Sequence, residues 1–171
     1  MALLSGKVAI VTGGGRGLGR CHALALAAQG AAVVVNDLGG SVTGGSPDQK
    51  QGGAADDVVA EIVGLRGRAV ANRASVADWA GAESIIADAV TAFGGLDIVV
   101  NNAGYVWNGA MQNHSDEQWQ AMLDMHATAP FRLLRAWLPW LKETANRERR
   151  ELGVPMCRKV VNISSVSGTT G

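Results

Sequence analysis

The chain has 171 residues, a length that suits one domain. Its 15 lysines and arginines balance 15 aspartates and glutamates, so it lacks the basic excess of a protein that binds nucleic acid or a membrane surface. Hydrophobic residues reach 47%, which predicts a sizeable core and excludes disorder as the main state. The two cysteines, Cys21 and Cys157, have neither disulfide-framework nor metal-ligand spacing, so we expect a cytoplasmic protein without a metal site.

Short runs of β-branched residues alternate along the chain with longer stretches at helical spacing. Five such runs predict strands, at residues 7–12, 31–36, 68–72, 96–101 and 159–163. Strands that alternate with helices predict an α/β fold, a parallel sheet with helices on both faces. Ser115 and Gln118 predict a capping box that opens a long helix over residues 116 to about 142. The charged segment 144–158 behind it is expected to be an exposed loop.

Glycines cluster where the first predicted strand meets the first helix, in the sequence TGGGRGLG of residues 12–19. Gly13 permits a tight turn, Gly17 lets the helix start approach a diphosphate, and Gly19 lets the helix pack closely on the strand. The next strand ends at Asp37, whose carboxylate can accept hydrogen bonds from a ribose. A sharp turn would explain the glycines alone, but the glycines together with Asp37 predict a dinucleotide site.

Two further motifs follow in the chain, NNAG at residues 101–104 and Ile-Ser-Ser at residues 163–165. With the TGxxxGxG spacing of the glycines, they make the chain resemble the short-chain dehydrogenase/reductase family from about Lys7 onward. Residues 36–40 look most like the hydroxyacyl-CoA dehydrogenase modules of peroxisomal multifunctional enzymes and their bacterial relatives. The resemblance implies a Rossmann-type doubly wound parallel sheet, truncated after the fifth strand, in a single NAD(P)-binding domain over residues 1–171 whose C-terminal part is missing.

The resemblance also assigns the cofactor site. It places NAD on Gly13, Gly15, Arg16, Gly17, Leu18, Gly19, Asp37, Leu38, Val76, Asn102, Ala103 and Gly104. Asp37 would bind the adenosine hydroxyls and repel the 2′-phosphate of NADP, whereas Arg16 could pair with that phosphate. We expect NAD, because an NADP phosphate would lie against the carboxylate. Ala74 stands where the family usually has an aspartate, which leaves the backbone of Ser75 and Val76 to contact adenine.

Two catalytic residues follow from the resemblance. Ser165 matches the serine that polarises the substrate carbonyl during hydride transfer. His126 aligns with a helix asparagine that helps to hold a proton-relay water, although a helix histidine satisfied by a neighbour explains it almost equally well. Pro130 has no N–H to donate to the carbonyl of His126. We therefore expect that carbonyl to bind the water and the Asn-to-His change to be tolerated.

The family's Tyr-x-x-x-Lys, which supplies the acid/base tyrosine, is absent from these residues. Tyr105 has Gly109 four places later, and only six residues follow Ser165. We expect an oxidoreductase of a secondary alcohol or ketone, with a 3-hydroxyacyl thioester suggested by the resemblance, that is a dimer or tetramer when intact and inactive as 171 residues alone. The alternatives are a non-catalytic dinucleotide-binding module and a structural subunit that packs through its long helix.

Overall fold

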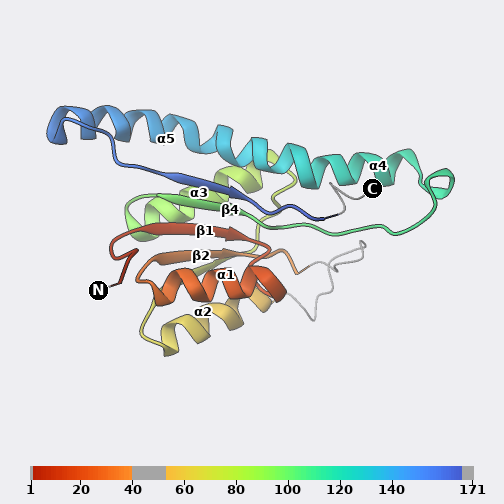
Figure 1. Cartoon of the computed structure of the whole chain (residues 1–171), viewed down its shortest axis with the longest axis horizontal. Coiled ribbons are helices and arrows are strands. Elements are labelled where there is room, and N and C mark those ends of the chain that lie inside the picture. The colour runs from red at the N-terminus through yellow and green to blue at the C-terminus, as the bar shows by residue number, and fades with distance from the viewer. Residues whose placement is uncertain (1, 40–52, 167–171) are drawn as a thin grey trace.

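The computed structural model describes residues 2–39 and 53–166. Five strands in these residues form a parallel sheet in the order β3-β2-β1-β4-β5 (Figure 1). Their bounds are β1 Val8–Thr12, β2 Ala32–Asn36, β3 Arg68–Asn72, β4 Ile98–Asn101 and β5 Lys159–Asn162. Each strand lies within two residues of its predicted range. The predicted α/β fold with a Rossmann-type doubly wound sheet is confirmed.

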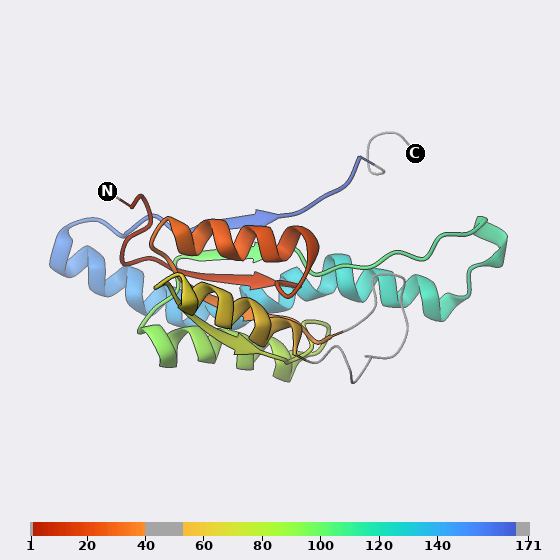
Figure 2. The same cartoon turned by 90° about the horizontal axis from the view of Figure 1, so that it is seen from below.

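Helices cover both faces of the sheet (Figures 1 and 2). Helices α1 (Gly17–Ala28) and α2 (Ala54–Gly64) pack on one face, and α3 (Trp79–Phe93) and α5 (Ala129–Leu152) pack on the other. All five residues of β1 and of β2 are buried, because these two strands are covered on both faces. Among the helices that the structure describes, none combines the length and the apolar composition of a membrane span.

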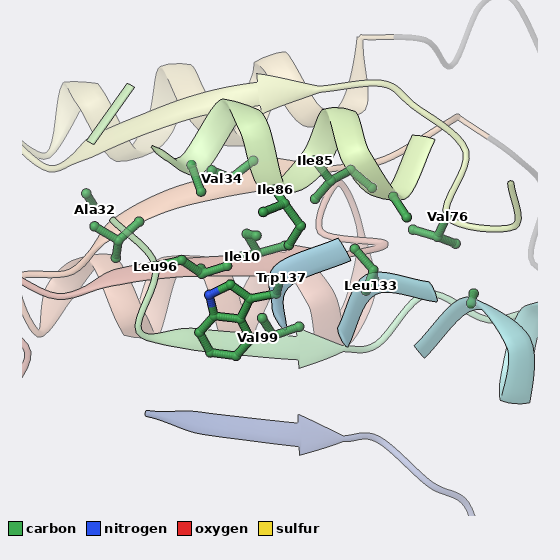
Figure 3. Packing of buried hydrophobic residues seen from close by; sticks show 14 residues of the cluster. Ile10, Ala32, Val34, Val76, Ile85, Ile86, Leu96, Val99, Leu133 and Trp137 are labelled. Atoms are coloured by element: carbon green, nitrogen blue, oxygen red, sulfur yellow. The ribbon is translucent and has the colours of Figure 1, made fainter. Parts of the chain in front are cut away.

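The larger part of the core lies between the sheet and helices α3 and α5 (Figure 3). Side chains from three strands and two helices meet there, among them Ile10, Val34, Val99, Ile85, Ile86, Leu133 and Trp137. The fully buried members of this cluster remove most of their apolar surface from water, at about 25 cal/mol per Å². This core fixes the positions at which the strands end, and therefore the site built on those ends.

The predicted long helix is divided. The capping box of Ser115 and Gln118 is present and opens α4 (Asp116–Leu123), after a short 3₁₀ turn η2 (Met111–Asn113). A π-helical turn, η3 (Asp124–Thr128), then separates α4 from α5. The sequence predicts one continuous helix here, and Pro130 at the start of α5 accounts for the irregular hydrogen bonding.

The predicted loop over residues 144–158 is wrong in its first half, because α5 continues to Leu152 and ends at Gly153 with φ of 81°. The charged residues of this segment are good helix formers. Thr144 is buried, and Glu148 lies one turn later on the same face. The Glu148 carboxylate accepts a hydrogen bond from the guanidinium of Arg158 at 2.7 Å, which ties the end of α5 to the start of β5.

Strand β5 is the edge of the described sheet, and all four of its residues are exposed. Val160 and Val161 remain 41% and 43% accessible. β5 contrasts with β1 and β2, whose side chains are buried on both faces of the sheet.

Candidate functional site

The candidate residues meet at the carboxyl edge of the sheet. The chain passes from β1 outward through β2 to β3 and then returns to β4 on the other side of β1. Doubly wound sheets bind ligands where the strand order reverses in this way, outside the carboxyl ends of the strands. In this sheet the reversal falls between β1 and β4, so the loops after these two strands face the candidate site.

The glycine loop between β1 and α1 approaches its neighbours more closely than side chains would permit. Gly13 has φ of +61°, and a Cβ atom there would lie 2.9 Å from Cα of Ala103. A Cβ atom at Gly19 would overlap the carbonyl oxygen of Gly13. A Cβ atom at Gly17 would meet no described atom within 4 Å. The loop is therefore packed tightly on its inner side and open on the side of the α1 N-terminus.

The carboxylate of Asp37 lies against this glycine loop. Its Oδ2 atom accepts the amide N–H of Gly15 at 2.9 Å, and its Oδ1 atom accepts that of Gly39 at 2.8 Å. A Cβ atom at residue 15 would come within 2.8 Å of that carboxylate oxygen, so the contact requires glycine. An ionised carboxylate has about four acceptor positions, so the Asp37 carboxylate can still accept further donors.

Hydrogen bonds of Thr12 connect the end of β4 to the glycine loop. Its hydroxyl oxygen accepts the amide N–H groups of Asn102 and Ala103, each at 3.0 Å. In return, the Asn102 carboxamide donates to the carbonyls of Thr12 and Gly13, at 2.9 and 3.1 Å. The segment from Asn102 to Gly104 is thereby held beside Gly13, as the predicted site requires. Thr12 is not among the predicted site residues, although it opens the TGGGRGLG motif.

A buried amide network holds the turn after β3. The Asn36 side chain donates to Oδ1 of Asn72 and to the carbonyl of Ala74, both at 2.9 Å. The Asn72 side chain donates in turn to the Asp88 carboxylate at 2.7 Å. Val76, two residues beyond Ala74, is buried at the same edge of the sheet. The network fixes the backbone around Ala74, the position at which the resemblance predicts an aspartate in the family.

A pocket of about 260 Å³ lies between the ends of β4 and β5 and the π-helical turn. Its polar lining comes from Thr12, Asn101, Asn162, His126 and Ser164. The predicted Val76 and Ala103 also line it. Ser165 is the next residue after Ser164 and is exposed.

His126 occupies the π-helical turn beside Gly104. Its Nε2 atom lies 2.9 Å from the carbonyl oxygen of Tyr105, so Nε2 carries the hydrogen and donates it. The side chain thus has the neighbouring partner that the simpler interpretation predicts. The backbone is irregular as well, because the N–H of Ala129 reaches back five residues to the carbonyl of Asp124. The helical hydrogen bonding is thus irregular in the turn that holds His126.

The remaining predicted residues border the glycine loop from outside. Leu18 and Leu38 are 66% and 45% exposed at its rim. Arg16 lines a second pocket, of about 320 Å³, between α1 and α2. Arg20 lines the same pocket and donates three hydrogen bonds to Glu61, at 2.6, 2.7 and 3.1 Å.

A model of the short chain dehydrogenase family matches residues 7–171. The chain belongs to this family. The predicted resemblance to short-chain dehydrogenases is therefore confirmed.

Known short-chain dehydrogenases resemble the chain over most of its length. It is 39% identical over 98% of its residues to the hydroxyacyl-CoA dehydrogenase ChsB1 of Mycobacterium tuberculosis, and 44% identical over 81% to the peroxisomal multifunctional enzyme type 2 of Drosophila melanogaster. The chain spans 50% and 22% of the lengths of these two curated relatives. A crystal structure of a short chain dehydrogenase from Mycobacterium avium matches with a TM-score of 0.81 and 42% identity, covering 97% of this chain and 56% of that one.

Proposed function

We propose that the chain binds NAD as the cofactor-binding part of an oxidoreductase that transfers hydride between NAD and a secondary alcohol or ketone. The observation that carries the proposal is the Asp37 carboxylate, held at the glycine loop by the amides of Gly15 and Gly39. A dinucleotide needs a site for its diphosphate and, nearby, an acceptor for its ribose hydroxyls. The start of α1 and the Asp37 carboxylate, both beside the glycine loop, support the proposal that they supply these two features.

The diphosphate would lie at the N-terminus of α1. The first turn of this helix carries no acidic side chain that would repel an anion. The unpaired N–H groups of a helix start bind phosphate well. Gly17, the first residue of α1, leaves open the space that a side chain would fill.

Asp37 would select NAD over NADP. The amides of Gly15 and Gly39 orient its carboxylate, whose remaining acceptor positions suit two ribose hydroxyls. The 2′-phosphate of NADP would bring a second anion to the same place and repel it. Arg16 favours NADP, because a guanidinium pairs readily with phosphate. We give the carboxylate more weight because NADP would place its phosphate against it.

For the reaction, Ser165 would hydrogen-bond the substrate oxygen and polarise it. The carbonyl of His126, deprived of a helical donor by Pro130, would hold a water for proton transfer. The acid/base tyrosine is not among the 171 residues, so we propose that this chain alone binds the cofactor without turnover. A 3-hydroxyacyl thioester is the proposed substrate, since one relative is named a hydroxyacyl-CoA dehydrogenase. The single domain, the homo-oligomer and the cytoplasmic location stay predictions.

Calorimetric titration of the chain with NAD and with NADP tests the cofactor proposal. We expect NAD to bind at least tenfold more tightly than NADP. Asp37→Asn should weaken NAD binding by about tenfold or more, because hydrogen bonds to a charged group contribute about 1.5–3 kcal/mol. Glu83→Gln, which neutralises an exposed carboxylate on α3, is the control and should change neither affinity. Equal affinities in the wild type, or an Asp37→Asn variant that binds NAD normally, would contradict the proposal.

The alternative is a dinucleotide-binding module without catalysis, which the same glycine loop and Asp37 carboxylate would serve. The protein encoded by the whole reading frame, assayed with a 3-hydroxyacyl-CoA and NAD, separates the two functions. Formation of NADH supports the dehydrogenase. Tight NAD binding without turnover of this substrate or of simple secondary alcohols supports the module.

A further inference from the structure

The turn after β3, residues 74–76, lies at one end of the path that a dinucleotide would take across the sheet. On this side of the sheet the strands follow in the order β1, β2, β3. A diphosphate at the start of α1 lies at the end of β1, and a ribose bound by Asp37 lies at the end of β2. The base carried by that ribose would therefore reach the turn after β3.

The side chain of Asn72, the last residue of β3, is the centre of the amide network below this turn. Its Nδ2 atom donates to the Asp88 carboxylate at 2.7 Å and to the Ser84 hydroxyl at 3.2 Å. Its Oδ1 atom accepts the Asn36 side-chain N–H and the Ala74 amide N–H, both at 2.9 Å. A carboxamide offers two donors and two acceptor positions, so all four are used. The residue is 5% exposed.

The network works with only one orientation of the Asn72 carboxamide. A half-turn about its last bond would exchange the positions of Nδ2 and Oδ1. The Ser84 hydroxyl fits either orientation, because it can both donate and accept. The Asp88 carboxylate only accepts, so it fits Nδ2 alone. Asp88 is therefore the partner on α3 that turns Oδ1 toward the two donors on the other side.

Those two donors belong to the parts of the chain that border the proposed cofactor site. Ala74 has both backbone groups in the network, because its N–H donates to Asn72 and its carbonyl accepts the Asn36 side chain. The backbone carbonyl of Asn36 accepts the N–H of Gly14 in the glycine loop at 2.9 Å, and Asp37 follows directly. The orientation of one carboxamide thus bears on the turn after β3 and on the end of β2.

Asp88 itself lies away from the glycine loop. It is half-buried on α3, one helical turn after Ser84. α3 packs on one face of the sheet, whereas α1, which carries the proposed diphosphate site, packs on the other. Asp88 is connected to the carboxyl edge of the sheet through its hydrogen bond to Asn72.

We propose that Asp88 is a positioning residue, whose carboxylate fixes the orientation of the Asn72 carboxamide and thereby holds the turn at residues 74–76 in the form that receives the base of the cofactor. The consequence for cofactor binding rests on the proposed function. The order of the turn does not, and it can be measured without cofactor.

Hydrogen exchange of the protein from the whole reading frame, followed by mass spectrometry, measures the order of the turn. Asp88→Ala removes the acceptor at a helical position that suits alanine, so a folding failure is not expected. Exchange in residues 73–78 should rise at least tenfold. Exchange in residues 64–68, at the opposite end of β3, should stay within twofold. Glu83→Ala, the same change at an exposed position of α3, is the matched control and should alter neither segment.

A reciprocal exchange of the two side chains tests the orientation. Asn72→Asp places a second carboxylate opposite that of Asp88 and should raise exchange in residues 73–78 at least tenfold. In the double variant Asn72→Asp/Asp88→Asn, the carboxylate at position 72 accepts from the same two donors and also from the amide at position 88. Exchange should then return to within threefold of the wild type. Independent contributions to stability would instead make the two effects add.

The binding arm uses Asp88→Ala. We expect the Kd values of NAD and of AMP, which carries the adenine, to rise at least fivefold and by the same factor. The Kd of nicotinamide mononucleotide, which lacks the adenosine half, should stay within twofold.

Four results would overturn the proposal. They are unchanged exchange in residues 73–78 of Asp88→Ala, an equal rise in residues 64–68, a double variant that exchanges as fast as Asn72→Asp, and AMP binding that stays normal although the turn exchanges faster. Failure of the wild type to bind NAD would refute the proposed function and leave the exchange results as they are.

Discussion

The loop after β1 and the exit from β5 reach the same edge of the sheet, but they are held by different forces. β1 is buried at all five residues, and the loop after it is fixed by backbone contacts that leave no room for a Cβ atom at Gly13 or Gly19. β5 is exposed at all four residues and is held by the Asn101 carboxamide and the ion pair of Arg158. The loop after β1 should therefore be destabilised most by substitutions that add volume. The exit from β5 should be destabilised most by substitutions that remove a polar group.

Gly19→Ala should give the largest effect, because the new methyl group would overlap the carbonyl oxygen of Gly13. We expect the free energy of unfolding to fall by about 3 kcal/mol and NAD binding to be lost. Urea denaturation and NAD titration measure the two effects. Gly64→Ala is the control, because no described atom lies within 4 Å of a Cβ there and the residue is helical. It should raise stability by about 0.5–1 kcal/mol. A Gly19→Ala protein that binds NAD normally would refute the steric account of the loop.

Thr12→Val tests whether the loss of a polar group also lowers stability and NAD affinity in the region around the loop after β1. The hydroxyl accepts the N–H groups of Asn102 and Ala103 inside the fold. Without it two partly buried amides lose this acceptor, and we expect a loss of about 1–3 kcal/mol in unfolding free energy together with weaker NAD binding. Thr12→Ser keeps the hydroxyl and should retain NAD affinity at a cost of about 1 kcal/mol for the missing methyl. If both variants bind NAD equally, the hydrogen bonds of the Thr12 hydroxyl do not position the site.

Pro130→Ala tests the irregular turn that lies between the two regions. Alanine supplies the N–H that Pro130 lacks, so the turn should become regular helix, and the carbonyl of His126 should then accept that N–H and release the proposed water. We expect kcat of the protein from the whole reading frame to fall by about tenfold or more. Pro139→Ala is the matched control, since Pro139 is exposed in the interior of α5. It should stabilise the helix and leave kcat unchanged. An unaltered kcat in Pro130→Ala would count against the relay.

The smallest expected effect is on the ion pair near the start of β5. Hydrogen bonds from the Arg158 guanidinium and the Met156 amide lower the pKa of the Glu148 carboxylate from 4.5 to about 2. Because this pKa is lower in the folded state, the ionised carboxylate contributes stability above about pH 4.5 and loses it as the pH falls toward 2.

The corresponding experiment compares urea midpoints of the wild type and Glu148→Gln. The variant should be slightly less stable at neutral pH, and the difference should vanish as the pH falls from about 4.5 to about 2. Glu151→Gln, three residues further along the same helix, should match the wild type over this range. A Glu148→Gln difference that does not depend on pH would show that the pair adds nothing through charge.

The sequence predicts those features of the molecule that depend on neighbouring residues. The β-branched runs locate the strands, and the glycine spacing locates the close contacts of Gly13 and Gly19. Pro130 indicates the irregular turn, although not that it is a π turn. The end of α5 was missed because its charged residues suit an exposed loop and a helix equally well, and the bond from Arg158 to Glu148 favours the helix.

Carboxamide pairs between strands could not be predicted from local pattern. Asn101 and Asn162 are 61 residues apart, and only the strand order places them side by side. The same holds for Thr12, whose partners lie 90 and 91 residues further along the chain. Four of the five strands end in asparagine, and this repetition was the available signal.

A crystal structure of the chain soaked with NAD tests the central claim most directly. The account predicts density for the diphosphate at the N-terminus of α1 beside Gly17, with the adenosine ribose hydroxyls within hydrogen-bond distance of the Asp37 carboxylate. Dinucleotide density at any other place, or an ordered ribose that makes no contact with Asp37, would contradict it.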